Sequence, residues 1–440
     1  MTDRSKRQAP TALRARRSFA RVAVVALATV LVGALGTSAA RADGEPDTGF
    51  SGDGKTVFDF AGLSAGATAV AKQGDRYVLG GFAEGGGVTS RFAVTRLRGN
   101  GDIDPAFGGG DGLVVTDFFG RSSRIDDLHV LGSGKILVAG SATMVSGDEL
   151  MALARYMPDG RLDHSFGGDG KVVVGFGGDY SQAFAIVLLP DGKFVAVGAA
   201  GPDYDHRRIA LARFLPNGNL DMAFGGGDGL ATARPPGSVA SEASSAAASG
   251  GKIVVGGITV AHGDLDFLVA RFRSSGSLDP SFNGDGIARR DNKRFDIANA
   301  VVVQGSGKVV LGGSTFGVGQ EPNVALVRWS GAGVFDTAFG VAETDFGGND
   351  QIAGLAVDGL GRLVGAGFWG GSMGVFRFSA MGHQDLGFGS EGAVGIDFPA
   401  PEFPIAVGQA LLTPGAKILV VGAARIDEDT FGFAAARLMA

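Results

Sequence analysis

Short acidic clusters interrupt an otherwise apolar chain and are the first candidates for chemistry. They comprise Asp148 with Glu149; Asp203, Tyr204, Asp205 and His206; His262, Asp264 and Asp266; and Asp427, Glu428 and Asp429. Paired carboxyl groups can transfer protons during the cleavage of glycosidic bonds. Clustered carboxylate oxygens can also hold a hard cation such as calcium. Because charged side chains are the default surface of loops, a solvated face or a broad binding face is an equally direct interpretation.

A second set of charged residues recurs at constant spacing. Six arginines are each followed eight residues later by an aspartate: Arg96 and Asp104, Arg155 and Asp163, Arg213 and Asp221, Arg271 and Asp279, Arg328 and Asp336, and Arg377 and Asp385. Arg437 lies too close to the terminal Ala440 to have such a partner, and Asp47 supplies the missing aspartate at the other end of the chain. A functional site is rarely repeated in every unit of a repeat protein, so we interpret all these pairs as structural.

Other chemically suggestive motifs fail on context. Gly-Ser-Gly-Lys occurs at 132–135 and 305–308, but apolar runs typical of strands follow it, whereas a phosphate-binding loop leads into a helix. The chain has 5 histidines without H-x-x-x-H spacing and no cysteine. We therefore predict no catalytic residue, no metal cluster and no cofactor, with calcium at the Asp-Gly turns as the one alternative left open.

The elements that must position these residues follow a long repeat. The pattern Asp-x-x-Phe ends at Phe50, Phe107, Phe166, Phe224, Phe282, Phe339 and Phe388, at intervals of 57, 59, 58, 58, 57 and 49 residues. Each unit also has a basic residue that opens an apolar run with a glycine five positions later, as in Lys135 and Gly140. Because the apolar runs are short and are bounded by Gly, Asp and Pro, we expect four strands in each unit.

The motif Asp-x-x-Phe-x-Gly-Asp-Gly, intact at 163–170, and the turn Pro-Asp-Gly-Lys at 190–193 resemble the bacterial delta-60 repeat family. This resemblance implies an exported, propeller-like protein and supplies no catalytic residues. We predict an all-β fold, a seven-bladed β-propeller of four-stranded blades, in which a strand at 55–60 closes the last blade. The irregular sixth repeat also leaves six or eight blades open, and an open β repeat array is the alternative architecture.

The first 42 residues differ from the rest. A basic stretch precedes an apolar segment at 22–36, and Ala40-Arg41-Ala42 offers a cleavage site, so we interpret 1–42 as a signal peptide. Arg16-Arg17 also suggests the twin-arginine type. Residues 43–440 then form one propeller domain, which we expect to be exported to the periplasm or the extracellular medium. Removing 8 basic residues and 1 acidic residue leaves that domain with a net charge of −13, which opposes nucleic-acid binding.

Turns between first and second strands, and between third and fourth strands, are nearly invariant, whereas the other connections differ from unit to unit. The variable connections share one end of a propeller, which we take as the binding face. We predict a monomeric, non-enzymatic binding or structural module with a protein or glycan partner and no transmembrane span. The alternative is a hydrolase or lyase of a polysaccharide or related polymer that uses the acidic loop residues. A deep pocket lined by convergent acids of shifted pKa counts against the first prediction.

Overall fold

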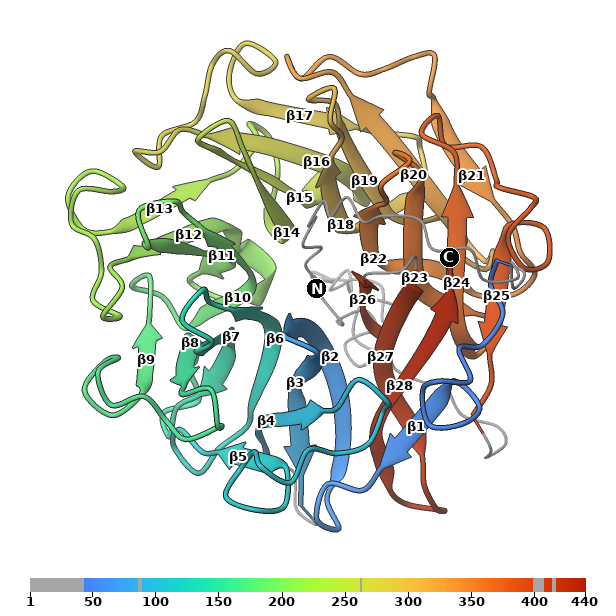
Figure 1. The fold of residues 1–440 in the computed structure, drawn as a ribbon. Helices are drawn as coiled ribbons and strands as arrows, with labels where there is room; N and C mark the ends of the chain where they lie inside the picture. The colour runs from blue at the N-terminus through green and yellow to red at the C-terminus, as the bar shows by residue number, and fades with distance from the viewer. Residues whose placement is uncertain (1–42, 86–88, 262, 399–406, 414–416) are drawn as a thin grey trace, which may run out of the picture.

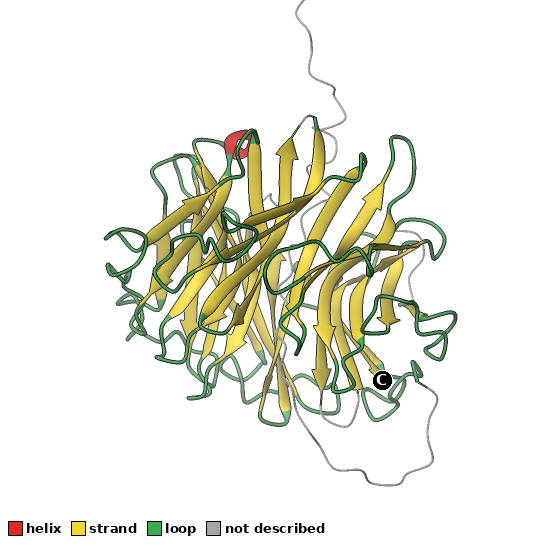
Figure 2. Ribbon diagram, turned by 90° about the horizontal axis from the view of Figure 1, so that it is seen from above, coloured by secondary structure: helices red, strands yellow, loops and turns green. Residues whose placement is uncertain are grey.

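The computed structural model describes residues 43–85, 89–261, 263–398, 407–413 and 417–440, so the predicted signal peptide lies outside the described residues. In the described part, strands form a ring of four-stranded antiparallel blades around a central axis (Figure 1). One helical turn is found among the described residues, η2 (Tyr204–His206), and it lies at one end of the ring (Figure 2). No helix in this part of the chain has the length and hydropathy of a membrane span. The predicted all-β propeller is confirmed.

Seven described blades follow one another along the chain. Their innermost strands are β2 (Ser64–Gln73), β6 (Ser123–Val130), β10 (Tyr180–Leu188), β14 (Ala240–Ser249), β18 (Phe295–Val303), β22 (Asp350–Val357) and β26 (Val407–Thr413). The second strands are β3 (Arg76–Glu84), β7 (Ile136–Thr143), β11 (Phe194–Gly201), β15 (Lys252–Ala261), β19 (Val309–Phe316), β23 (Leu363–Trp369) and β27 (Lys417–Arg425). The third strands are β4 (Ser90–Leu97), β8 (Glu149–Tyr156), β12 (Arg208–Phe214), β16 (Asp264–Phe272), β20 (Asn323–Trp329), β24 (Ser372–Phe378) and β28 (Phe431–Met439). The outermost strands are β5 (Leu113–Thr116), β9 (Lys171–Val174), β13 (Leu230–Ala233), β17 (Ile287–Arg290), β21 (Val341–Thr344), β25 (Ala393–Ile396) and β1 (Lys55–Phe58).

Every innermost strand contains a register shift typical of a β-bulge, as between Ile125 and Asp127 in β6. The recurring glycine of the second strand lies opposite the residues next to this bulge. A Cβ atom on Gly140 would lie 1.9 Å from the carbonyl oxygen of Arg124, and glycines in five other blades face the same obstruction. The glycine therefore makes room for a bulge that re-aims one inner-strand side chain in each blade.

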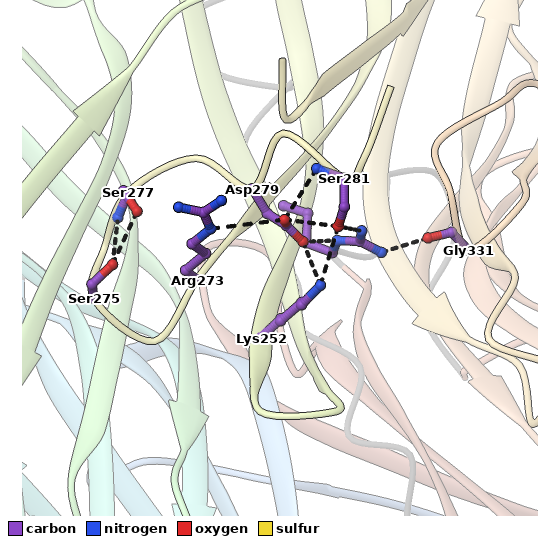
Figure 3. A network of polar contacts seen from close by, with 8 residues as sticks. Lys252, Arg273, Ser275, Ser277, Asp279, Ser281 and Gly331 are labelled. Atoms are coloured by element: carbon purple, nitrogen blue, oxygen red, sulfur yellow. Dashed lines mark hydrogen bonds and ion pairs between the residues drawn. The ribbon is translucent and has the colours of Figure 1, made fainter. Parts of the chain in front are cut away.

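The repeated Arg, Asp and Phe side chains form one structural unit per blade. Each arginine Nε lies 2.6–2.9 Å from its aspartate, and its guanidinium lies 4.4–5.0 Å from the centre of the repeat phenylalanine ring. In blade four, Asp279 also binds Lys252 at 2.6 Å, and Arg271 reaches the carbonyl oxygen of Gly331 in blade five (Figure 3). These contacts join neighbouring blades, consistent with the structural interpretation of the pairs.

The first and last parts of the described chain lie side by side. Strand β1 pairs antiparallel with β28, with Lys55 opposite Ala436 (Figure 1). This strand ends at Phe58, two residues before the predicted limit, while Phe60 stays fully buried. Phe50, Phe58 and Phe60 pack with side chains of β2 and β27 in one core cluster, which joins blade seven to blade one. An open array, the alternative architecture, lacks these contacts.

Candidate functional site

The variable connections meet at one end of the ring, here called the variable face. Because neighbouring strands in a blade are antiparallel, the connections from second to third strand and from fourth strand to the next blade leave the sheets at the same end. The innermost strands begin at this face, and their first residues surround the axis. Polar side chains at these positions are therefore the ones that a ligand at the axis would meet.

Strand β6 of blade two is unusually polar at the variable face. The Arg124 Nε atom lies 3.1 Å from Asp126 Oδ1, and Asp126 is fully buried at the bulge. Gln182 of blade three donates from Nε2 to Asp126 Oδ2 over 2.9 Å. Burial raises the pKa of Asp126 to about 6, despite the opposing effect of Arg124. This carboxyl group can therefore hold or release a proton near neutral pH.

Deeper along the axis, Asp127 joins three blades. Its carboxylate accepts from Gln409 Nε2 of blade seven at 3.1 Å and from the backbone amide of Ile186 in blade three at 2.6 Å. His129 Nε2 lies 3.1 Å from the same carboxylate and is buried. Asp127 thus serves the packing of the ring.

A chain of contacts continues from Asp126 toward blade four. The Tyr180 hydroxyl donates to Gln182 Oε1 at 3.1 Å, and the Tyr180 ring lies edge-on to Tyr204, with 5.5 Å between centroids. The Arg207 guanidinium lies 3.9 Å from the Tyr204 ring centroid, and its Nε donates to Glu242 Oε2 at 2.5 Å. We call this set the polar arc; its members are Arg124, Asp126, Gln182, Tyr180, Tyr204, Arg207 and Glu242.

Most of the polar arc was not predicted from the sequence. Only Tyr204 belongs to the predicted binding face. The segment 123–129 carries two aspartates, an arginine and a histidine where the equivalent strand of blade three is mostly apolar, and this contrast between repeats is the signal that could have identified it. Arg207 and Glu242 come from different blades, so no local pattern joins them.

Several predicted loop residues serve local turns instead. Asp203 accepts from the His206 backbone amide at 2.9 Å and lies 2.8 Å from His206 Nδ1, with both side chains more than half exposed. The bond from His206 lowers the pKa of Asp203. Asp427 accepts from the backbone amides of Asp429 and Thr430. The exposed Asp205, Glu428 and Asp429 do not join a shared site in the described residues, and His262 lies outside them.

Two predicted acids do converge, in what we call the blade-four acidic cluster. Asp264 and Asp266 meet Asp291, and one carboxylate oxygen from each lies within 4.8 Å of the others. Burial, followed by the charges of Asp291 and Asp264, raises the pKa of Asp266 to about 6. Asp291 was missed because it follows β17, and only the strand register, with Phe267 opposite Arg290, brings it beside Asp266. The prediction of no metal cluster was therefore made without Asp291, the third acid of this group.

The basic residues near this cluster already have partners. Arg294 Nη1 lies 2.7 Å from Glu343, and the Arg290 guanidinium lies 4.5 Å from the Phe335 ring centroid. Lys293 is largely exposed and lies 3.3 Å from Asp291. Their charges offset part of the acidity at this edge of the variable face.

Comparison with known proteins places the repeat. The segments 131–166, 189–224 and 249–282 match a family model described as domain of unknown function (DUF5122) beta-propeller. These are β-propeller repeats. Each matched segment spans the second and third strands of one blade, in blades two to four, and ends at a repeat phenylalanine. A search of curated proteins found no match to the sequence.

Solved structures with similar propeller repeats include glycan-active proteins. A polysaccharide lyase of family PL25, an ulvan lyase bound to a glucuronate- and rhamnose-sulfate-containing ligand, is 10% identical with a TM-score of 0.51, covering 85% of this chain and 94% of the lyase. A protein of unknown function from Dyadobacter fermentans is 13% identical, with a TM-score of 0.48 and coverages of 88% and 97%. An N11 neuraminidase-like protein from a flat-faced bat virus is 12% identical, with a TM-score of 0.44 and coverages of 95% and 97%. At these identities the likeness shows the propeller fold.

The prediction of a non-enzymatic binding or structural module is corrected by these findings. The solved structures of similar fold include a polysaccharide lyase, the class of enzyme that the alternative prediction names. The structure also brings acids together at the variable face, and two of them, Asp126 and Asp266, have a pKa raised to about 6. The non-enzymatic prediction expected no deep pocket lined by acids of this kind.

Proposed function

We propose that this protein cleaves a glycan polymer at the polar arc, as a hydrolase or lyase. The observation that carries the proposal is Asp126, a fully buried carboxyl group at the variable face whose pKa is raised to about 6. A general acid or base works best when its pKa lies near the working pH. The ulvan lyase that shares the fold acts on an acidic glycan, which supports this class of substrate.

Arg124 of the polar arc favours an anionic polymer. Arg124 keeps 28% of its side chain exposed while it covers Asp126, so an incoming carboxylate or sulfate meets this guanidinium first. Movement of Arg124 toward the substrate uncovers Asp126 and removes the charge that lowers its pKa. Asp126 then holds its proton more strongly and can donate it to a leaving glycosidic oxygen.

The rest of the arc supplies binding and a second carboxylate. The partly exposed Tyr204 ring, backed by Arg207 at 3.9 Å, offers an apolar face for a sugar ring. Glu242 is held by Arg207 at 2.5 Å and remains the second acid of the arc. In hydrolysis, one carboxyl protonates the leaving oxygen and the other activates water or attacks. In elimination, a base removes the proton next to a uronate carboxylate, a double bond forms and the glycosidic oxygen leaves.

The experiment is a cleavage screen of the chain 43–440 on neutral, uronate-containing and sulfated polysaccharides. Polymer molar mass reports any cleavage, and ultraviolet absorbance of unsaturated ends separates elimination from hydrolysis. We expect loss of mass with an anionic polymer, and a rate at least about 100-fold lower in Asp126→Asn. Asp285→Asn, an exposed turn acid that caps the Ile287 amide at 2.9 Å, is the matched control and should keep full activity. Unchanged mass for every polymer, or full activity of Asp126→Asn, would reject the proposal.

Two finer assignments belong to the same proposal. The intact motif at 163–170 supports membership of the delta-60 repeat family, and the composition of 1–42 supports export to the periplasm or medium. An exported monomer that meets polymers outside the cytosol agrees with the proposed substrate class. Mass spectrometry of the secreted chain should find residue 43 at its N-terminus.

A further inference from the structure

The blade-four acidic cluster is a second site, separate from the polar arc. Asp264 and Asp266 lie in β16, at the end of the loop that precedes it, and Asp291 directly follows β17. Their three carboxylate oxygens lie within 4.8 Å of one another. The start of β16 and the residue after β17 therefore bring three carboxylates together.

Asp266 distinguishes this cluster from an ordinary group of surface acids. Only 2% of the surface of Asp266 is exposed. Its Oδ1 atom has no hydrogen-bond partner among the described residues. Burying a carboxylate oxygen without a partner is costly unless a cation or a donor compensates it.

Arg289 acts on Asp266 through its charge, but no side chain among the described residues hydrogen-bonds that oxygen. Lys293 lies at 3.3 Å from Asp291, at the exposed side of the cluster, and 88% of its side chain is exposed. In Asp264, Asp266 and Asp291, three carboxylates share the point, and Asp296 of β18 is a further buried acid nearby. An added positive charge with several coordination positions matches this arrangement better than one more side-chain donor.

We propose that Asp264, Asp266 and Asp291 form a binding site for a divalent cation, with calcium as the preferred ion. The donor set consists of oxygen atoms, which favours hard cations over zinc or copper. Calcium takes about six to eight oxygens in flexible geometry, so three carboxylates can be completed by water or backbone carbonyls. Asp291 is partly exposed, at 33% of its side chain, and leaves an entry path for the ion.

A bound cation would tie two loops of the variable face together. It would join the start of β16 to the β17–β18 connection, beside the paired ends of β16 and β17. Its expected effect is therefore on the stability of blade four, and the proposed cleavage at the polar arc neither requires nor excludes it.

The test uses the chain 43–440, stripped with a chelator, and calcium chloride as the probe. Isothermal titration calorimetry should give one site per chain. Thermal unfolding should shift upward by about 3 °C at a hundredfold excess of calcium over Kd. Magnesium should bind more weakly, because it requires tighter octahedral geometry.

Variants place the site. Asp266→Asn and Asp291→Asn should each abolish the calcium shift, and Asp291→Asn provides a test at a partly exposed position if the buried variant unfolds. Asp285→Asn, an exposed acid of the same blade, should keep the full shift. No calcium binding by the wild type, or a shift retained by both cluster variants, would overturn the proposal. Cleavage activity is measured separately with chelator present, so either proposal can fail alone.

Discussion

The Arg437 guanidinium donates from Nε to Asp47 Oδ2 over 2.6 Å, although 390 residues separate the two in sequence. Lys417 also binds Asp47 at 2.6 Å, and the Phe50 ring lies 4.8 Å from the Arg437 guanidinium. The last blade therefore borrows its aspartate and phenylalanine from the start of the domain. This contact makes the N-terminal segment part of the ring.

We expect Asp47→Asn to destabilise the domain by about 3–5 kcal/mol, because it leaves Arg437 buried without its counter-charge. Urea unfolding of 43–440 measures the change. Asp53→Asn is the control, since Asp53 is an exposed turn residue of the same segment that accepts from the Lys55 amide. A similar free energy of unfolding for Asp47→Asn and wild type would show that the closing pair contributes little.

Most of the fold could be predicted from the sequence because the same residues recur in every blade. Constant spacing of Arg, Asp and Phe identified the blades, and the unpaired Arg437 pointed to Asp47. Little of the polar arc could be predicted, because Asp126, Tyr180 and Glu242 lie on inner strands of three blades and meet only around the axis. The glycine at position 140 was visible as a recurrence, while its cause, the bulge in β6, was not.

Gly140→Ala should disturb both fold and site. The added Cβ would meet the Arg124 carbonyl oxygen at 1.9 Å and push β6 away from its bulge. We expect a loss of about 1–3 kcal/mol in unfolding free energy, together with reduced cleavage through displaced Arg124 and Asp126. The control is Gly132→Ala, where nothing lies within 4 Å of the added atom. Wild-type activity in Gly140→Ala would show that cleavage does not depend on the bulge in β6.

Stability should fall as the pH rises from about 4 to 7 because of buried acids such as Asp350. Its side chain is fully buried, and burial raises its pKa to about 6. The folded state thus binds this proton more tightly than the unfolded state, and its contribution is lost as the pH rises through 6. Below about pH 4 the opposite applies to Asp163 and Asp279, whose pKa is lowered despite burial by bonds from Lys135 and Lys252.

Asp350→Asn isolates the first effect. Asn keeps an acceptor for the Phe346 amide, which donates to Asp350 at 2.7 Å, but cannot ionise. Urea midpoints between about pH 5 and 7.5 should therefore decline less in the variant, by up to about 1.5 kcal/mol in free energy. An unchanged pH dependence would show that Asp350 does not carry the decline.

Tyr204→Ala should weaken substrate binding more than it slows the chemical step. The ring lies between Tyr180 and Arg207 and offers its remaining surface to a sugar. We expect KM to rise about tenfold, which corresponds to about 1.4 kcal/mol of binding, with kcat within about twofold. Tyr204→Phe should behave as wild type. A fall in kcat at constant KM would indicate that Tyr204 acts in the chemical step and not in substrate binding.

A closed ring holds inner strands of different blades around one axis, and truncation of the N-terminal segment is the sharpest test of this closure. Thermal unfolding is compared between the chain 43–440 and the same chain without residues 43–62, which carry β1, Asp47 and the buried Phe50 and Phe60. We expect a fall in Tm of more than about 5 °C, or failure to fold, because an unpaired blade edge and an uncompensated Arg437 remain. Equal melting temperatures would contradict closure and favour an open array of repeats.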